Sequence, residues 1–218
     1  MKKVLTSLLA VLFLTASAYA EKRIGISGAL TAFNSDGTET VKSSGETNSG
    51  DHVEVVIVPS IFVELVNDNG VGVGIDFLPI EADLGSATNS RADTDTDDSS
   101  DTAGDNKVSA ELSSHTTVYA LVPFKAGYLK AGLAMATIDT TETLATGTTY
   151  GNEDVTGLMI GYGINRETGN GAFLRSELTY TDYEDVTFNG SLDGDSVRNK
   201  IDGDVDALAF RISVGKSF

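Results

Sequence analysis

Hydrophobic and polar residues alternate along most of the chain beyond residue 20. Alternation with a period of two is typical of β-strands with one apolar face, and no long stretch beyond residue 20 has the periodicity of an amphipathic helix. The pattern therefore predicts a fold built from strands. The eight predicted strands cover Arg23–Phe33, His52–Val66, Val71–Ile80, Val108–Val122, Tyr128–Ile138, Val155–Asn165, Ala172–Tyr183 and Gly203–Phe218.

The connections between these strands alternate in length. Long connections cover residues 35–51, 81–107, 139–154 and 184–202, and short ones cover residues 67–70, 123–127 and 166–171. A soluble β-sandwich has no reason to sort its connections in this way. In bacterial outer-membrane barrels, short periplasmic turns and longer external loops join an even number of antiparallel strands. The sequence therefore predicts an all-β fold, an eight-stranded antiparallel transmembrane β-barrel.

In most of the predicted strands one face is almost purely apolar, and the other carries glycine, hydroxyl and charged residues. In a sandwich the apolar faces would pack together, whereas in a barrel they meet lipid and the polar faces line the lumen. We favour the barrel, because the even strand number, the alternating connection lengths and both ends of the chain agree with it. An interior of eight strands is just wide enough to be filled by side chains. Opposite charges are then expected to pair across the lumen. The charged lumen residues predicted by the alternation are Arg23, Glu54, Glu64, Asp76, Lys130, Arg175, Glu177 and Arg211.

The predicted strand Val108–Val122 leaves two assignments open. Either Thr116, Val118, Ala120 and Val122 face lipid, or Tyr119 and Leu121 do. Alternation alone does not distinguish the two, because both faces carry apolar side chains.

The first twenty residues resemble an export signal. Two lysines precede an apolar run from residue 4 to residue 14, and Ala-Tyr-Ala at residues 18–20 is a small-x-small cleavage site. The run is shorter than the ~20 residues that a membrane-spanning helix needs. We expect residues 1–20 to be a cleaved Sec signal peptide and residues 21–218 to form one barrel domain. The chain has no cysteine, which excludes disulfides, thiolate metal sites and a lipid-modified cysteine.

The chain is strongly acidic. It has 32 Asp and Glu residues against 15 Lys and Arg, a formal net charge of −17. Such a chain would repel phosphate backbones, so no nucleic-acid partner is expected. Most of the acidic residues lie in the four long connections, where they would attract cations to the external surface. An acid-rich exterior adapted to saline surroundings would show the same excess.

Three aspartates in the second long connection, Asp93, Asp95 and Asp97, have the spacing of the first positions of a calcium-binding loop. The turn glycine of that motif is replaced by Asp98, and no glutamate stands at the twelfth position. We therefore expect only a weak cluster for divalent cations. No cofactor is expected.

Glu111, Ser113 and His115 alternate along one predicted strand, which would place all three on the same face. Serine, histidine and an acid are the minimal set for nucleophilic hydrolysis. Adjacent residues on one strand face lie about 6.5–7 Å apart at the backbone, so the spacing alone does not form the required hydrogen bonds. The chain is expected not to be an enzyme, and a lipid-modifying hydrolase is the least favoured alternative.

The end of the chain, FRISVGKSF, resembles the C-terminal signal of outer-membrane proteins, in which a terminal aromatic residue follows alternating hydrophobic ones. Phe210, Ile212, Val214 and Phe218 match this signal, and the match implies recognition by the barrel-assembly machinery. The stretches VYALVPFKAGYLKAGLA and GAFLRSELTYTDYEDV resemble the barrel domain of the small OmpA/OmpX-like, porin-family outer-membrane proteins.

This resemblance extends over essentially the whole chain beyond the signal. It implies a location in the outer membrane of a Gram-negative bacterium, with outer-membrane lipids as the surrounding partner. The function expected is a structural or surface-interaction role for a barrel with a charged, side-chain-filled lumen and acidic external loops. A narrow cation-preferring pore is the alternative.

Overall fold

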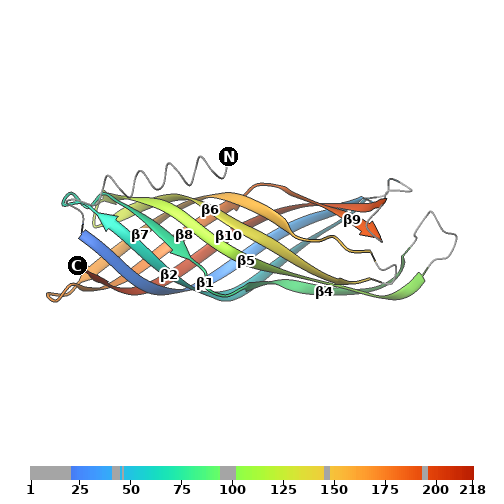
Figure 1. Cartoon of the computed structure of the whole chain (residues 1–218), viewed down its shortest axis with the longest axis horizontal. Helices are drawn as coiled ribbons and strands as arrows, with labels where there is room; N and C mark the ends of the chain where they lie inside the picture. Colours follow the sequence, from blue (N-terminus) through green and yellow to red (C-terminus); the bar gives the residue numbers. More distant parts are fainter. Residues whose placement is uncertain (1–20, 41–44, 46, 94–101, 145–147, 193–195) are drawn as a thin grey trace.

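The computed structural model describes residues 21–40, 45, 47–93, 102–144, 148–192 and 196–218. They form an elongated barrel of antiparallel strands in one sheet (Figure 1). The strands are β1 (Glu21–Thr40), β2 (Thr47–Val66), β3 (Gly72–Phe77), β4 (Ala82–Asp93), β5 (Thr102–Phe124), β6 (Gly127–Thr143), β7 (Glu153–Glu167), β8 (Ala172–Tyr183), β9 (Val186–Leu192) and β10 (Ser196–Ser217). No helix in these ranges is long and apolar enough to cross a membrane.

The ten strands occupy eight positions around the barrel. In two places, two successive strands lie end to end along the same neighbouring strand. β3 and β4 both pair with β5, the first up to Phe77↔Thr116 and the second from Ala82↔Leu112. In the same way β8 and β9 both pair with β10. Pairing of β1 with β10 closes the sheet on itself. A single closed sheet confirms the predicted barrel and excludes the two packed sheets of a sandwich.

The two ends of the barrel differ. The short turns β2–β3, β5–β6 and β7–β8 lie at one end, together with the start of β1 and the end of β10 (Figure 1). We call this the inner end, since short turns face the periplasm in outer-membrane barrels. The opposite end, which the long hairpins reach, is the outer end.

The eight predicted strands are confirmed, and for Ala172–Tyr183 the predicted bounds are those of β8. Several strands run further toward the outer end than predicted, such as β1 to Thr40 and β6 to Thr143. The predicted long connections 81–107 and 184–202 were wrong in part, because they contain β4 and β9. Beyond the lipid the outward face of a strand meets water, so its residues become polar and the alternation of hydrophobicity weakens.

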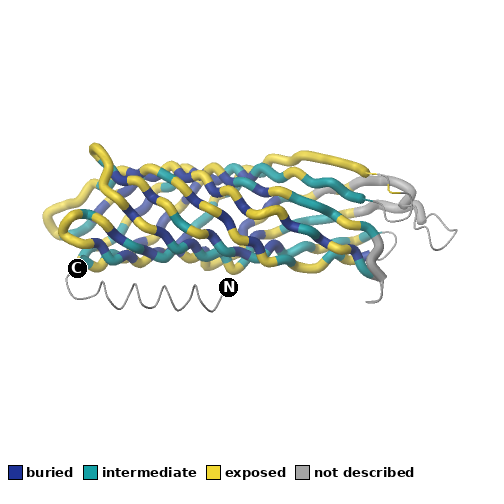
Figure 2. Tube along the Cα trace, turned by 90° about the horizontal axis from the view of Figure 1, so that it is seen from above, coloured by how far each residue is buried: buried dark blue, intermediate teal, exposed yellow. Residues whose placement is uncertain are grey.

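Exposed and buried positions alternate around the barrel (Figure 2). Many of the exposed positions carry large apolar side chains, which form a belt. Ile57, Leu158 and Ile160 are among the most exposed, at 76%, 65% and 62%. Soluble proteins rarely expose a contiguous apolar surface of this extent, and in a bilayer it meets hydrocarbon. In β5 the open assignment is resolved, because Tyr119 and Leu121 are buried in the lumen.

Pro59 lies within β2, where a missing N–H is costly if both edges of the strand are paired. Among the described residues, β2 pairs with β3 only through Ile61–Val66, whereas its pairing with β1 covers its whole length. Pro59 therefore lies where one edge of β2 has no ladder partner.

Candidate functional site

The inner part of the lumen is crossed by a buried ion pair between strands that are not neighbours. Arg175 of β8 donates two hydrogen bonds to Glu64 of β2, with N–O distances of 2.5 and 2.7 Å. Both side chains are almost fully buried, at 1% and 0% exposure. The guanidinium also lies 5.1 Å from the ring centre of Phe62 and 5.2 Å from that of Phe173. This bidentate pair spans the lumen and fills it.

A second pair, between Lys130 of β6 and Glu177 of β8, is joined to the first by two tyrosines. Lys130 Nζ lies 3.1 Å from Glu177 Oε1. Tyr128 donates its hydroxyl hydrogen to Glu177 at 2.9 Å, and its ring centre lies 5.3 Å from the guanidinium of Arg175. Tyr119 donates to Glu64 at 2.7 Å, and its ring centre lies 3.9 Å from Lys130 Nζ. Each carboxylate is matched by a cation and by a hydroxyl donor, as buried charges require.

The third pair joins Arg211 of β10 to Asp76 of β3, 2.5 Å apart. Ser60 donates a hydrogen bond to the same carboxylate at 2.8 Å, and Arg211 donates to both Ser60 and Ser27. The side chains of Arg211 and Asp76 are 11% and 3% exposed. The three ion pairs, with Tyr119, Tyr128, Ser27 and Ser60, are called the lumen seal below.

Six of the eight charged lumen residues predicted from the sequence make up these three pairs. The other two lie outside the seal. Arg23 is at the inner end, where it contacts Glu21 at 2.5 Å and Glu167 at 2.7 Å. Glu54 lies toward the outer end, 3.2 Å from His52, and remains partly exposed because the lumen is open at that height.

The sequence interpretation missed the two tyrosines. Each faces a glycine on the neighbouring strand, Gly74 for Tyr119 and Gly163 for Tyr128. A Cβ added at Gly163 would lie 2.3 Å from the Tyr128 hydroxyl oxygen, and one at Gly74 would lie 2.6 Å from the ring of Tyr119. The glycines are the signal that could have located the rings, since a large lumen residue needs a small one across the ladder.

The outer part of the lumen is apolar, which the prediction of a charged lumen did not anticipate. A cluster of buried apolar side chains lies above the seal. Its members include Phe33, Leu84, Leu112, Ile138, Val155, Val186, Phe188 and Val205. Several of these residues lie on β4 and β9, the two strands that the sequence analysis placed in loops.

The hydrolase alternative is not supported by the positions of Ser113 and His115. A bulge between Ser113 and Thr116 interrupts the pairing of β5 with β6, and Ser114 has a φ of 51°. The expected common face is therefore wrong. The Ser113 hydroxyl donates to Asp139, whereas His115 Nε2 contacts the hydroxyl of Tyr183 at 3.0 Å. Serine and histidine thus have different partners.

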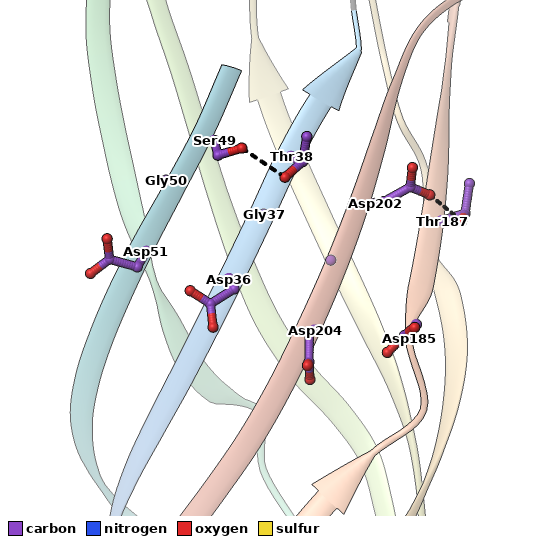
Figure 3. Close-up of a pocket in the computed structure, with 11 residues that line it drawn as sticks. Asp36, Gly37, Thr38, Ser49, Gly50, Asp51, Asp185, Thr187, Asp202 and Asp204 are labelled. Atoms are coloured by element: carbon purple, nitrogen blue, oxygen red, sulfur yellow. Dashed lines mark hydrogen bonds between the residues drawn. The ribbon is translucent and has the colours of Figure 1, made fainter. Parts of the chain in front are cut away.

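Aspartates line a groove of about 600 Å³ on the wall near the outer end (Figure 3). Asp51, Asp36 and Asp204 lie directly opposite one another on β2, β1 and β10. Asp185 lies beside them, and Asp202 in the next row accepts a hydrogen bond from Thr187 (Figure 3). Like charges at opposed positions are destabilising.

Partial burial and repulsion from Asp185, Asp182, Asp206 and Asp36 raise the pKa of Asp204 above its ordinary value. A raised pKa means that the folded state holds this proton more tightly than the unfolded chain does. The opposed aspartates therefore lower the stability of the folded barrel at neutral pH. This loss of stability becomes smaller as the pH drops toward the pKa of Asp204 in the folded state.

The candidate cation cluster Asp93, Asp95 and Asp97 lies outside the residues whose side chains the structure describes. Within the described residues, no group of three or more His, Asp or Glu side chains has an arrangement that could hold a metal ion. The residues matched to the assembly signal, Phe210, Ile212, Val214 and Phe218, all face outward and are at least 41% exposed.

No family model matches the sequence, and no curated protein matches it. Solved structures of outer-membrane proteins share its fold. The outer membrane protein OprG from Pseudomonas aeruginosa aligns with a TM-score of 0.58 and 16% identity, over 92% of this chain and 96% of that one. The outer membrane protease OmpT from Escherichia coli aligns with a TM-score of 0.51 and 7% identity, over 91% of this chain and 97% of that one. The chain therefore has the fold of an outer-membrane β-barrel.

Proposed function

We propose that this protein is a non-conducting outer-membrane barrel with a structural and surface-interaction role, as the OmpA/OmpX-like resemblance implied. The observation that carries the proposal is the lumen seal. Three ion pairs join strands across the inner lumen, and their six charged side chains are at most 11% exposed. An ion would have to break these pairs to pass, so the seal favours a closed barrel over a pore.

The outward surfaces support the same role. The belt of exposed apolar residues would contact outer-membrane lipids, and the outward-facing residues near Phe218 would be read by the barrel-assembly machinery during insertion. Beyond the belt, β1, β2, β5, β6 and β10 extend toward the outer end and present polar residues to the medium, among them Asp36, Asp51 and Asp204. A stable barrel that holds such hairpins above the membrane suits a surface-interaction protein.

Planar-bilayer recording tests this proposal. The wild-type barrel is expected to give no steady current, because the six charges of the seal are paired with one another. A double Arg175→Ala, Glu64→Ala variant removes one pair together with most of its volume, and we expect it to open a measurable conductance.

A steady, cation-selective current through the wild-type protein would refute the closed barrel and favour the alternative, a narrow cation-preferring pore. The loss of that current on replacing Asp76 by asparagine would place the ion path through the seal. The hydrolase alternative has no observation in its favour, since Ser113 and His115 have different hydrogen-bond partners.

A further inference from the structure

Above the seal, the lumen contains a cavity of about 420 Å³ with mainly apolar walls. Its lining comes from β1, β2, β4, β5, β6, β9 and β10, so it lies inside the barrel. The apolar side chains that line it include Leu84, Val108, Ile138, Val186, Phe188 and Ile201. We call this cavity the cup. Its volume falls within the range of small-molecule sites in proteins, which are also mostly apolar.

Part of the cup is open because three glycines lie side by side in its wall. Gly37 of β1 is paired with Gly50 of β2 on one side and with Gly203 of β10 on the other. A Cβ added at Gly37 or Gly50 would meet no atom within 4 Å. Three adjacent positions without side chains therefore leave space that ordinary lumen residues would fill.

The cup is closed below and open toward the outer end. Its lining reaches Gly50 and His52, which are exposed to solvent. Part of the buried apolar cluster lines it, and other members, such as Phe33 and Leu112, lie beneath it, followed by the Arg211–Asp76 pair of the seal. A molecule that enters from outside can thus be held in the cup but has no open path through the barrel.

Negative charge lies along one side of the entrance, on β2, β1 and β10. Asp36, Asp51 and Asp204 border both the cup and the groove on the wall. Clefts lined by charge of one sign raise the local concentration of oppositely charged molecules and repel those of the same sign. An apolar wall with an acidic entrance therefore accepts neutral or cationic molecules and disfavours anions.

From these observations we propose that the cup is a binding site, open to the cell exterior, for a small and mostly apolar molecule that carries no negative charge. The site goes beyond the structural role proposed above. It requires the apolar walls and the glycine row, and it does not require conductance.

Fluorescent probes of matched shape test the site. The barrel in phosphatidylcholine nanodiscs is titrated with N-phenylnaphthylamine, which is neutral, and with anilinonaphthalene sulfonate, which has the same rings and a negative charge. Empty nanodiscs give the background from lipid. We expect saturable binding of the neutral probe that depends on the protein, and no such binding of the sulfonate.

Two leucine substitutions supply the matched variants. The double Gly37→Leu, Gly50→Leu variant fills the cup, and each single variant is measured as well. The control, Gly28→Leu, makes the same change at an outward position where a Cβ also meets nothing within 4 Å. Gel migration before and after heating confirms that each variant is folded.

Complete loss of the saturable signal in the folded double variant, with the signal retained in Gly28→Leu, would support the site. Three results would overturn the proposal: no saturable binding by the wild type, undiminished binding by folded cup-filling variants, or sulfonate binding as strong as that of the neutral probe.

Discussion

Replacing Arg175 by methionine is expected to destabilise the barrel by about 3–5 kcal/mol, the cost of breaking a buried ion pair by removing one partner. The substitution leaves Glu64 charged and fully buried, with Tyr119 as its remaining hydrogen-bond donor. Urea unfolding of the reconstituted barrel, followed by circular dichroism, measures the change in the free energy of unfolding.

The matched control is an exposed ion pair. Lys200 and Asp202 lie 2.8 Å apart and are each 47% exposed. Lys200→Met is expected to cost less than about 1 kcal/mol, because water screens such pairs. Adding Glu64→Gln to Arg175→Met should recover part of the lost stability. If Arg175→Met and Lys200→Met lower the free energy of unfolding by similar amounts, the buried Arg175–Glu64 pair does not stabilise the barrel more than an exposed pair does.

Placing a charge in the apolar belt should have the second-largest effect. Ile160 lies near the middle of β7, pairs with Tyr180 and Ala131, and is 62% exposed. If the belt is in lipid, Ile160→Arg costs about 2–4 kcal/mol, the penalty for arginine at the midplane of a bilayer. Urea unfolding in lipid vesicles measures this cost.

The same substitution beyond the belt separates the effect of the membrane from the effect of arginine itself. Thr141 is exposed near the outer end of β6, and there Thr141→Arg is expected to cost about 0–1 kcal/mol. If Ile160→Arg and Thr141→Arg lower the free energy of unfolding equally, the belt does not lie in lipid.

Alternation of hydrophobicity was enough to predict the barrel, because lipid and lumen impose opposite polarities on the two faces of a strand. The pattern is clear at Ile24 and Ile26, whose outward side chains meet lipid. It fails for β4, where exposed residues such as Ser86 and Thr88 are polar. Water accepts polar side chains on the outer face, so the local sequence no longer distinguishes a strand from a loop.

The charged residues of the seal could be predicted from the face they occupy, but their pairing could not. Arg175 and Glu64 are separated by 111 positions in the sequence and meet only because the sheet closes. The cup was missed for a related reason. Its walls include Val186 and Phe188 of β9, which become lumen residues only when β9 continues the path of β8 beside β10.

The division of the lumen into a sealed inner part and an open cup is the central claim, and cysteine labelling tests it most directly. The chain contains no native cysteine, so a thiol-specific label attaches only to the single cysteine that is introduced. Gly37→Cys places a thiol in the cup. Ser213→Cys places one at the seal, opposite Arg175 in the ladder, where the native hydroxyl is buried and has no hydrogen-bond partner in the described structure.

A membrane-impermeant maleimide is added to the folded protein in nanodiscs, and the extent of labelling is followed by mass spectrometry. We expect Gly37→Cys to react readily and Ser213→Cys to react only after the barrel is unfolded. Labelling of Ser213→Cys in the folded barrel as fast as that of Gly37→Cys would contradict the sealed lumen.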